Sequence, residues 1–146
     1  MKVLLLNPPA KGGVRYVREG RCEQRLSSFQ YNMIPISLPS TAALLRREGH
    51  DVLIVDAIAR NLSIEEVLEA SADFGAELAL VNVSTPSFRS DAEAAGRLKS
   101  GLAGLFAAAY GVHVTALPEA SLADTTFDAV IRGEPEVTAA DLARAL

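Results

Sequence analysis

The sequence is poor in residues that build metal sites and cross-links. Its 146 residues include one cysteine, Cys22, two histidines and no tryptophan. A single cysteine excludes an intrachain disulfide, and it excludes a zinc or iron–sulfur site built from several thiolates of this chain. The chain therefore has to fold on an ordinary apolar core, for which its length and its 49% hydrophobic content suffice. A cytoplasmic location is expected.

Long hydrophobic runs and excess positive charge are also missing. The longest apolar stretches, at 3–6 and 105–110, are far shorter than the ~20 residues that cross a membrane, and no signal-peptide pattern opens the chain. The net charge is −4 and the pI about 5.2, which argues against a nucleic-acid surface, although a local basic patch around 15–25 is compatible with the sequence. Neither a membrane nor a nucleic acid is expected as partner.

The apolar runs present are short and regularly spaced. Residues 2–7 form an apolar segment stopped by two prolines, as is typical of a strand buried on both faces. Further strands are predicted at 51–57, 78–84, 104–110 and 127–133. For the fourth strand, "VHVTAL" at 112–117 is an alternative. We favour 104–110, which leaves Gly111 and His113 at the carboxyl end of that strand.

Helical signals lie between these runs. Helix 37–49 is indicated by capping hydroxyls, basic residues in its last turn and Gly49. Helix 62–77 has the capping-box spacing of Ser63 and Glu66 and ends near Gly75. The remaining helices are predicted at 89–101, 118–124 and 136–146. The segment 8–36 is much longer than an ordinary strand-to-helix connection, and such loops are usually functional or disordered.

This alternation predicts a flavodoxin-like (Rossmann-like) α/β fold. The expected architecture is a three-layer sandwich whose five-stranded parallel sheet has the order 2-1-3-4-5. Such sheets bind ligands beyond the carboxyl ends of their strands, at the switch point between strands one and three. His50 falls at the opposite edge and is interpreted as a solvent-facing turn residue. The residues predicted at the ligand-binding edge are Asn7, Pro8, Pro9, Ser84, Thr85, Ser87, Gly111, His113, Thr115, Gly133 and Glu134.

Several functions common on this fold lack their motifs. The turn after strand one has no Gly-x-Gly-x-x-Gly, although Asp56 imitates a ribose-binding carboxylate, and no Walker loop is present. Strand three ends in Asn82, Val83 and Ser84, so the acidic acceptor of a phospho-receiver domain is missing. Hydroxyls share the edge with His113, but no Gly-x-Ser-x-Gly elbow supports a hydrolase. No catalytic residue is predicted.

Five segments carry a family resemblance. In chain order they are "MKVLLLNPP", "REGRCEQR", "LRREGHDVLIVDA", "GVHVTALPE" and "DAVIRGEPEVT". Together they resemble the N-terminal cobalamin-binding domain of cobalamin-dependent radical SAM proteins, which include methyltransferases and proteins similar to the anaerobic magnesium-protoporphyrin ester cyclase. The resemblance spans almost the whole chain, but alanine replaces the glycine-rich end of strand four seen in many relatives.

The resemblance implies a cobalamin-binding module. It implies that the chain is part of a longer protein whose C-terminal radical SAM domain, the expected partner, holds S-adenosylmethionine and a [4Fe-4S] cluster. Other cobalamin domains of this fold supply a cobalt ligand from Asp-x-His-x-x-Gly after strand one, whereas "NPPAKGG" contains no histidine. A base-off cofactor without a histidine ligand is therefore expected, which suits methyl transfer through four-coordinate cobalt(I).

The resemblance also assigns roles at the edge. The benzimidazole tail is expected in a cleft between strands one and three, lined by Ser84, Thr85, Ala109 and Gly111. His113 is interpreted as a contact to the pocket or to corrin amides, with packing and cobalt ligation as alternatives. Glu134 either binds corrin amides or the tail ribose, or caps the last helix.

Two further points stay open at this stage. Segment 8–36, with Arg21 and Gln24, either covers the corrin or packs on the missing domain, and Cys22 is either near the cofactor or simply a small side chain. The alternative for the whole chain is a flavodoxin-like interaction domain without a cofactor.

Overall fold

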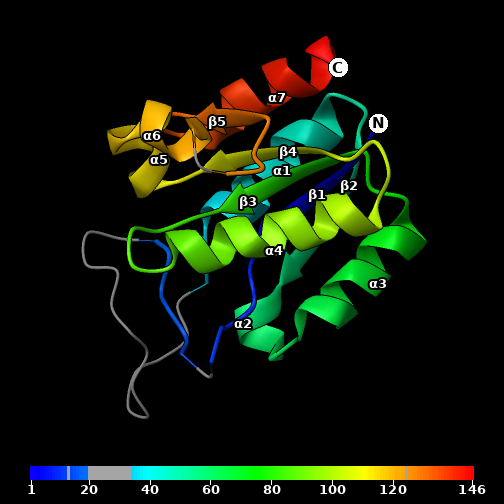
Figure 1. Cartoon of the computed structure of the whole chain (residues 1–146). Helices are drawn as coiled ribbons and strands as arrows, with labels where there is room; N and C mark the ends of the chain where they lie inside the picture. The colour runs from blue at the N-terminus through cyan, green and yellow to red at the C-terminus, as the bar shows by residue number, and fades with distance from the viewer. Residues whose placement is uncertain (13, 20–33, 124) are drawn as a thin grey trace.

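The computed structural model describes residues 1–12, 14–19, 34–123 and 125–146. Strands and helices alternate along the chain and form a five-stranded parallel sheet of order β2-β1-β3-β4-β5 (Figure 1). The strands are β1 Lys2–Asn7, β2 Asp51–Asp56, β3 Leu78–Asn82, β4 Phe106–Tyr110 and β5 Ala129–Ile131. The helices are α1 Ser37–Arg47, α2 Ala57–Arg60, α3 Ile64–Phe74, α4 Phe88–Gly101, α5 Val112–Ala116, α6 Pro118–Ala123 and α7 Pro135–Ala145.

Helices cover both faces of the sheet, which makes three layers. Because successive side chains of a strand point to opposite faces, Leu4 and Leu6 of β1 enter one core cluster, with α3 and α4, while Val3 and Leu5 enter the other, with α1 and α7. Helices α1 and α7 pack side by side, as do α3 and α4 (Figure 1). The predicted flavodoxin-like fold and strand order are confirmed.

Local signals set several element ends as predicted. Ser63 and Glu66 form the capping box that begins α3, and Gly75 ends that helix in the left-handed region at φ +73°. The strand at 106–110 confirms the choice of the fourth strand, and it leaves Gly111 and His113 beyond its carboxyl end. The segment "VHVTAL", considered as an alternative strand, instead forms the short helix α5, Val112–Ala116.

Other boundaries differ from the predictions for identifiable reasons. Strand β2 stops at Asp56, because the Asp56 carboxylate accepts a hydrogen bond from the Ala59 N–H and caps α2, a helix that was not predicted. Strand β5 is only three residues long. It begins at Ala129, since the Asp128 carboxylate takes the Ala107 N–H that an earlier start would pair through the backbone. Strand β3 ends at Asn82, two residues short of the prediction, where the chain turns toward α4.

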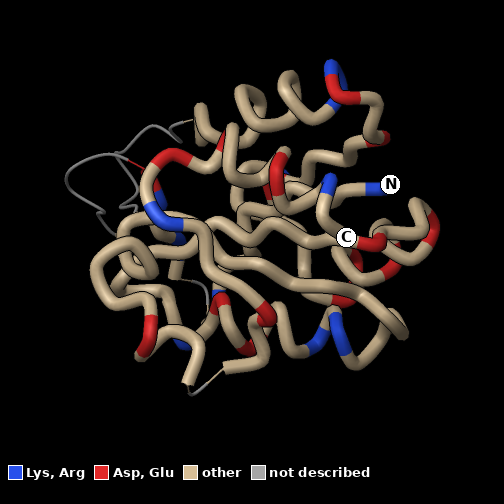
Figure 2. The backbone as a smooth tube through the Cα atoms, turned by 90° about the horizontal axis from the view of Figure 1, so that it is seen from above, with Lys and Arg blue, Asp and Glu red and all other residues tan. Residues whose placement is uncertain are grey.

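The outer surface carries mixed charge. Figure 2 shows acidic and basic residues interspersed over the described backbone. No helix in the described ranges is both long and apolar enough to cross a membrane.

Candidate functional site

The carboxyl ends of the strands meet at one edge of the sheet. Strands β1, β3 and β4 end at Asn7, Asn82 and Tyr110, and β5 ends beside them at Ile131. The site residues predicted from the sequence lie at these strand ends or in the segments that follow. The structure places most of them in a buried polar network or along two cavities.

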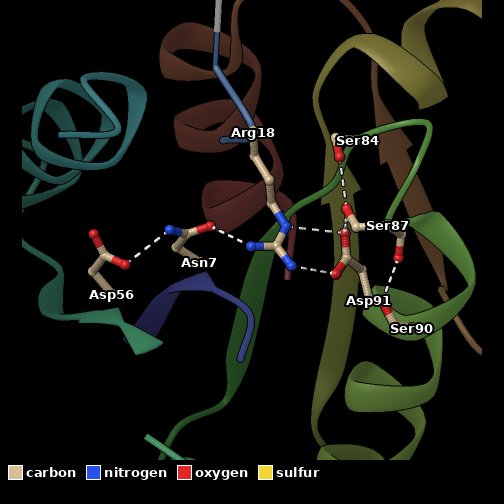
Figure 3. Close-up of polar contacts among 7 residues, drawn as sticks. All are labelled: Asn7, Arg18, Asp56, Ser84, Ser87, Ser90 and Asp91. Carbon is tan, nitrogen blue, oxygen red and sulfur yellow. Dashed lines mark hydrogen bonds and ion pairs between the residues drawn. The ribbon is translucent and has the colours of Figure 1, made fainter. Parts of the chain in front are cut away.

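The crevice between the ends of β1 and β3 is filled by Arg18. This side chain comes from the segment that follows β1, and only 4% of the residue is exposed. Its guanidinium donates to both oxygens of Asp91 in α4, over 3.1 Å from Nε and 2.7 Å from Nη2, and its Nη1 donates to Asn7 Oδ1 over 3.0 Å (Figure 3). The expected cleft between the first and third strands is therefore not open in this structure.

The network extends from both ends of this ion pair. Asn7 donates to Asp56 of β2 over 2.8 Å, and the Ser87 hydroxyl donates to Asp91 over 2.6 Å and lies 2.6 Å from the Ser84 hydroxyl (Figure 3). Burial raises the pKa of the Asp91 carboxyl above its usual value, and pairing with Arg18 acts in the opposite direction. Asn7, Ser84 and Ser87 thus lie at the predicted edge, but their side chains are buried in internal contacts.

An open cavity lies beside the filled crevice, on the face of the sheet covered by α1 and α7. We call it the α1–α7 cavity. Its volume is about 510 Å³, within the range typical of small-molecule sites. Ile36, Val112, Ala116 and Pro135 give it apolar walls. The other lining residues are Arg18, Glu19, Ser37, Ser40, Asn82, Tyr110, Gly111, Thr115, Gly133, Glu134 and Glu136.

Gly111 is required at the rim of this cavity by its backbone. Its φ is +125°, and a Cβ at this position would lie 2.3 Å from the Val83 carbonyl oxygen. Only glycine accommodates such a conformation together with such a close approach. The carboxyl ends of β3 and β4 consequently stay close, and α5 begins directly at the cavity.

Glu19 forms part of the cavity wall and caps α1. Its carboxylate accepts the Ser37 N–H over 3.1 Å, the Ser37 hydroxyl, and the Asn82 amide over 3.3 Å. The Ile36 cap position of α1 makes no side-chain capping bond, so the predicted hydroxyl cap is replaced by a carboxylate from a distant segment. Because the single Ser37 proton goes to Glu19, the Tyr110 hydroxyl donates to Ser37, 3.2 Å away. Burial raises the pKa of Tyr110 far above its usual value.

The predicted residues at the far rim are joined to one another. The Thr115 hydroxyl donates to the Gly111 carbonyl over 2.8 Å and accepts the Gly133 N–H over 3.0 Å, which ties α5 to the segment before α7. Glu134 occupies the cap position of α7 without a side-chain capping bond and is exposed. Its carboxylate is therefore available to a ligand at the cavity rim.

His113 and Thr85 border a different cavity. It has a volume of about 760 Å³ and lies between α4 and the α5–α6 pair, so we call it the α4–α6 cavity. His113 Nδ1 lies 3.3 Å from the Thr85 hydroxyl, and the imidazole stacks on Phe88 with ring centroids 4.1 Å apart. Burial lowers the pKa of His113 below its usual value, which favours the neutral ring at pH 7.

The remaining predicted residues lie apart from both cavities. Pro8 is buried, and Pro9 borders a third cavity beside α3 and α4. His50 lies at the opposite edge of the sheet, where its Nδ1 is 3.3 Å from the N-terminal amine. Cys22, Arg21 and Gln24 fall outside the described residues. Within the described ranges, no group of three or more His, Cys, Asp or Glu side chains is placed to hold a metal ion.

Sequence reasoning missed Arg18, Glu19, Asp91 and Tyr110. The only hint was the unusual length of segment 8–36, because a long loop at the ligand edge often supplies functional side chains. Nothing in the local sequence pairs Arg18 with an aspartate 73 positions later.

A three-layer flavodoxin-like domain with a cavity at the carboxyl edge of its sheet defines a ligand-binding α/β domain. The sequence model of the B12-binding domain family matches residues 25–143. Because this match covers most of the chain, the protein belongs to the B12-binding domain family.

One curated relative supports this assignment. The chain is similar to an uncharacterized methyltransferase of Pyrococcus horikoshii, with 28% identity over 147 aligned residues. The alignment covers 100% of this chain but only 29% of that protein, so the chain spans less than a third of its relative. No solved structure matches the chain significantly.

Proposed function

We propose that this chain binds cobalamin through the α1–α7 cavity and presents it to a separate catalytic domain. The observation that carries the proposal is this cavity, open at the carboxyl edge of the sheet in a member of the B12-binding family. Its apolar walls suit an aromatic nucleotide base, and Gly111 allows the close approach of β3 and β4 at its rim. Bound cobalamin supplies a cobalt centre for methyl transfer or related radical chemistry.

The residues that would hold the cofactor divide into two groups. Ile36, Val112 and Ala116 would pack against the tail, and Thr115 and Glu134 are placed at the rim, where polar groups of the tail or corrin would pass. Thr85 and His113 border the neighbouring α4–α6 cavity, so a contact with the corrin body suits them better than a contact with the tail.

We further propose that the cofactor is bound base-off without a histidine ligand. Residues 8–36, between β1 and α1, contain no histidine, and His50 is at the opposite edge. His113 is engaged with Phe88 and Thr85. The tail would then be retained by its fit to the cavity.

The resemblance extends the proposal to the parent protein. A relative described as a methyltransferase, more than three times the length of this chain, is consistent with a second domain of radical SAM type. That domain would hold S-adenosylmethionine and a [4Fe-4S] cluster, since one cysteine in 146 residues cannot bind such a cluster. We also propose a cytoplasmic location. The alternative, an interaction domain without cofactor, is not favoured by the family match.

The test is to incubate the purified chain with hydroxocobalamin, remove free cofactor by gel filtration and record the visible spectrum. Co-elution of about one equivalent with a base-off spectrum is expected. Loss of the chromophore from this chain, and from a longer parent chain treated in the same way, would contradict the proposal. Retention with an unchanged base-on spectrum would contradict only the base-off part.

A further inference from the structure

Residues 14–19, which we call the strap, cross the ligand-binding edge, where hydrogen bonds of three of its side chains hold it. No strap residue belongs to either core cluster of the described chain. The strap is held by Arg15, which donates to Asn61 over 2.6 Å, by Arg18 in the β1–β3 crevice, and by Glu19 at the beginning of α1. A segment that lies outside the core clusters opens at a lower free energy than the core.

Its central contact, the Arg18–Asp91 ion pair, is unusual for a loop. Both side chains are almost fully buried, at 2% and 0% exposure. Removing two charges from water is costly, so such a pair gives little net stability compared with apolar side chains of similar volume. Its effect is conformational, because the guanidinium fork fixes one position of the strap across the switch point.

The two anchored side chains also wall the α1–α7 cavity. Arg18 and Glu19 both line it, and Glu19 joins α1 to Asn82 of β3 across one side. A ligand whose base lies in this cavity and whose body covers the switch point has to pass residues 18–19. In this structure the cavity is open, but Arg18 fills the switch point on that route.

We propose that the strap is a latch on the cofactor site, closed by Arg18 and Glu19 in the free chain and opened when the tail of the cofactor enters. The inference rests on the proposed function and adds a gating step to it. Replacing Arg18 by lysine keeps the positive charge but removes the two-nitrogen contact with Asp91. This substitution therefore speeds entry of the cofactor. It also tightens apparent binding, because less of the chain is held in the closed state.

The first test needs no ligand. The Ser37 N–H donates to Glu19, and the Arg18 Nε–H to Asp91, so both protons are protected only while the strap is closed. Exchange measured by NMR should be at least ~100-fold faster for these two than for amides of β1 and β3. In Arg18→Lys, exchange of the Ser37 N–H should accelerate about tenfold. Exchange only through global unfolding, or no acceleration in the variant, would overturn the latch.

The second test measures entry, with cob(II)alamin as the probe in stopped-flow absorbance. For the wild type the observed rate should level off with increasing cobalamin at the opening rate. Arg18→Lys should raise this plateau about tenfold and lower Kd, and Glu19→Gln should do so more weakly. Arg144→Lys, in an exposed contact with Asp141 far from the site, is the control and should match the wild type.

The outcomes separate the two proposals. A plateau that Arg18→Lys leaves unchanged, a rate proportional to ligand in both proteins, or weaker binding by the variant overturns the latch while cobalamin binding stands. Fast exchange at Ser37 with no binding of cob(II)alamin by any variant supports an opening strap and overturns the proposed occupant.

Discussion

The β1–β3 crevice and the α1–α7 cavity lie next to each other at one edge of the sheet, yet one is filled and the other is open. The crevice holds a buried ion pair with its hydrogen-bonding serines, whereas the cavity has apolar walls and polar groups at its rim. The general rule for open α/β sheets gives the edge and the switch point. In this structure Arg18, from the segment after β1, fills one of the two neighbouring spaces and leaves the other open.

The largest effect on stability is expected in the filled β1–β3 crevice. Asp91→Ala leaves the Arg18 guanidinium buried without its partner, which should lower the free energy of unfolding by about 3–5 kcal/mol. Urea denaturation measures the change. Asp141→Ala, which breaks an exposed pair with Arg144, should leave the midpoint almost unchanged. Equal midpoints for the two variants would mean that the crevice is not closed by the ion pair.

A smaller loss of stability is expected at the rim of the open α1–α7 cavity. Gly111→Ala forces a Cβ toward the Val83 carbonyl at a φ of +125°, which should cost at least ~2 kcal/mol. Gly104→Ala is the matched control, since its φ is +83° but no atom lies within 4 Å of the added Cβ, so about 1 kcal/mol is expected. Thermal unfolding compares them. A Gly111 variant no less stable than the Gly104 variant would show that β3 and β4 do not approach so closely.

The smallest effect is expected at the α4–α6 cavity. This cavity is bordered by the titratable ring of His113, whereas the crevice holds a buried ion pair. The pKa of His113 is below its usual value of 6.5, so the unfolded chain binds more protons than the folded chain between these two values. Stability should therefore fall as the pH decreases through this window. His113→Asn should lose that part of the pH dependence in urea denaturation at a series of pH values. An NMR titration giving His113 a pKa at or above 6.5 would contradict the half-buried position of the ring.

The sequence carried enough information for the fold because its signals are local. The capping box of Ser63 and Glu66, the left-handed Gly75 and the apolar runs each act within a few residues. Together they give the alternation of strands and helices from which the strand order was predicted. Two short helices were missed because single residues redirect the chain at strand ends. Asp56 ends β2 by capping α2, and Gly111 directs the chain into α5 rather than into another strand.

The site was predicted less completely, since its geometry depends on contacts between distant residues. Gly111, Thr115, Gly133 and Glu134 were placed at the ligand edge from strand ends alone, and they do line the α1–α7 cavity. Asn7, Ser84 and Ser87 were also placed at the edge, but Arg18 and Asp91 draw them into the buried network. Their roles in ligand binding remain predictions.

The central claim is that the tail of the cofactor lies in the α1–α7 cavity and contributes much of the binding energy. Burying about 150–200 Å² of apolar tail is worth ~4–5 kcal/mol at ~25 cal/mol per Å², from which the cost of ordering the tail has to be subtracted. The most direct measurement is calorimetric titration of the chain with cobalamin and with cobinamide, which lacks the nucleotide tail. We predict that cobalamin binds at least ~100-fold more tightly, or ~2.7 kcal/mol. Equal affinities for the two corrinoids would contradict the claim.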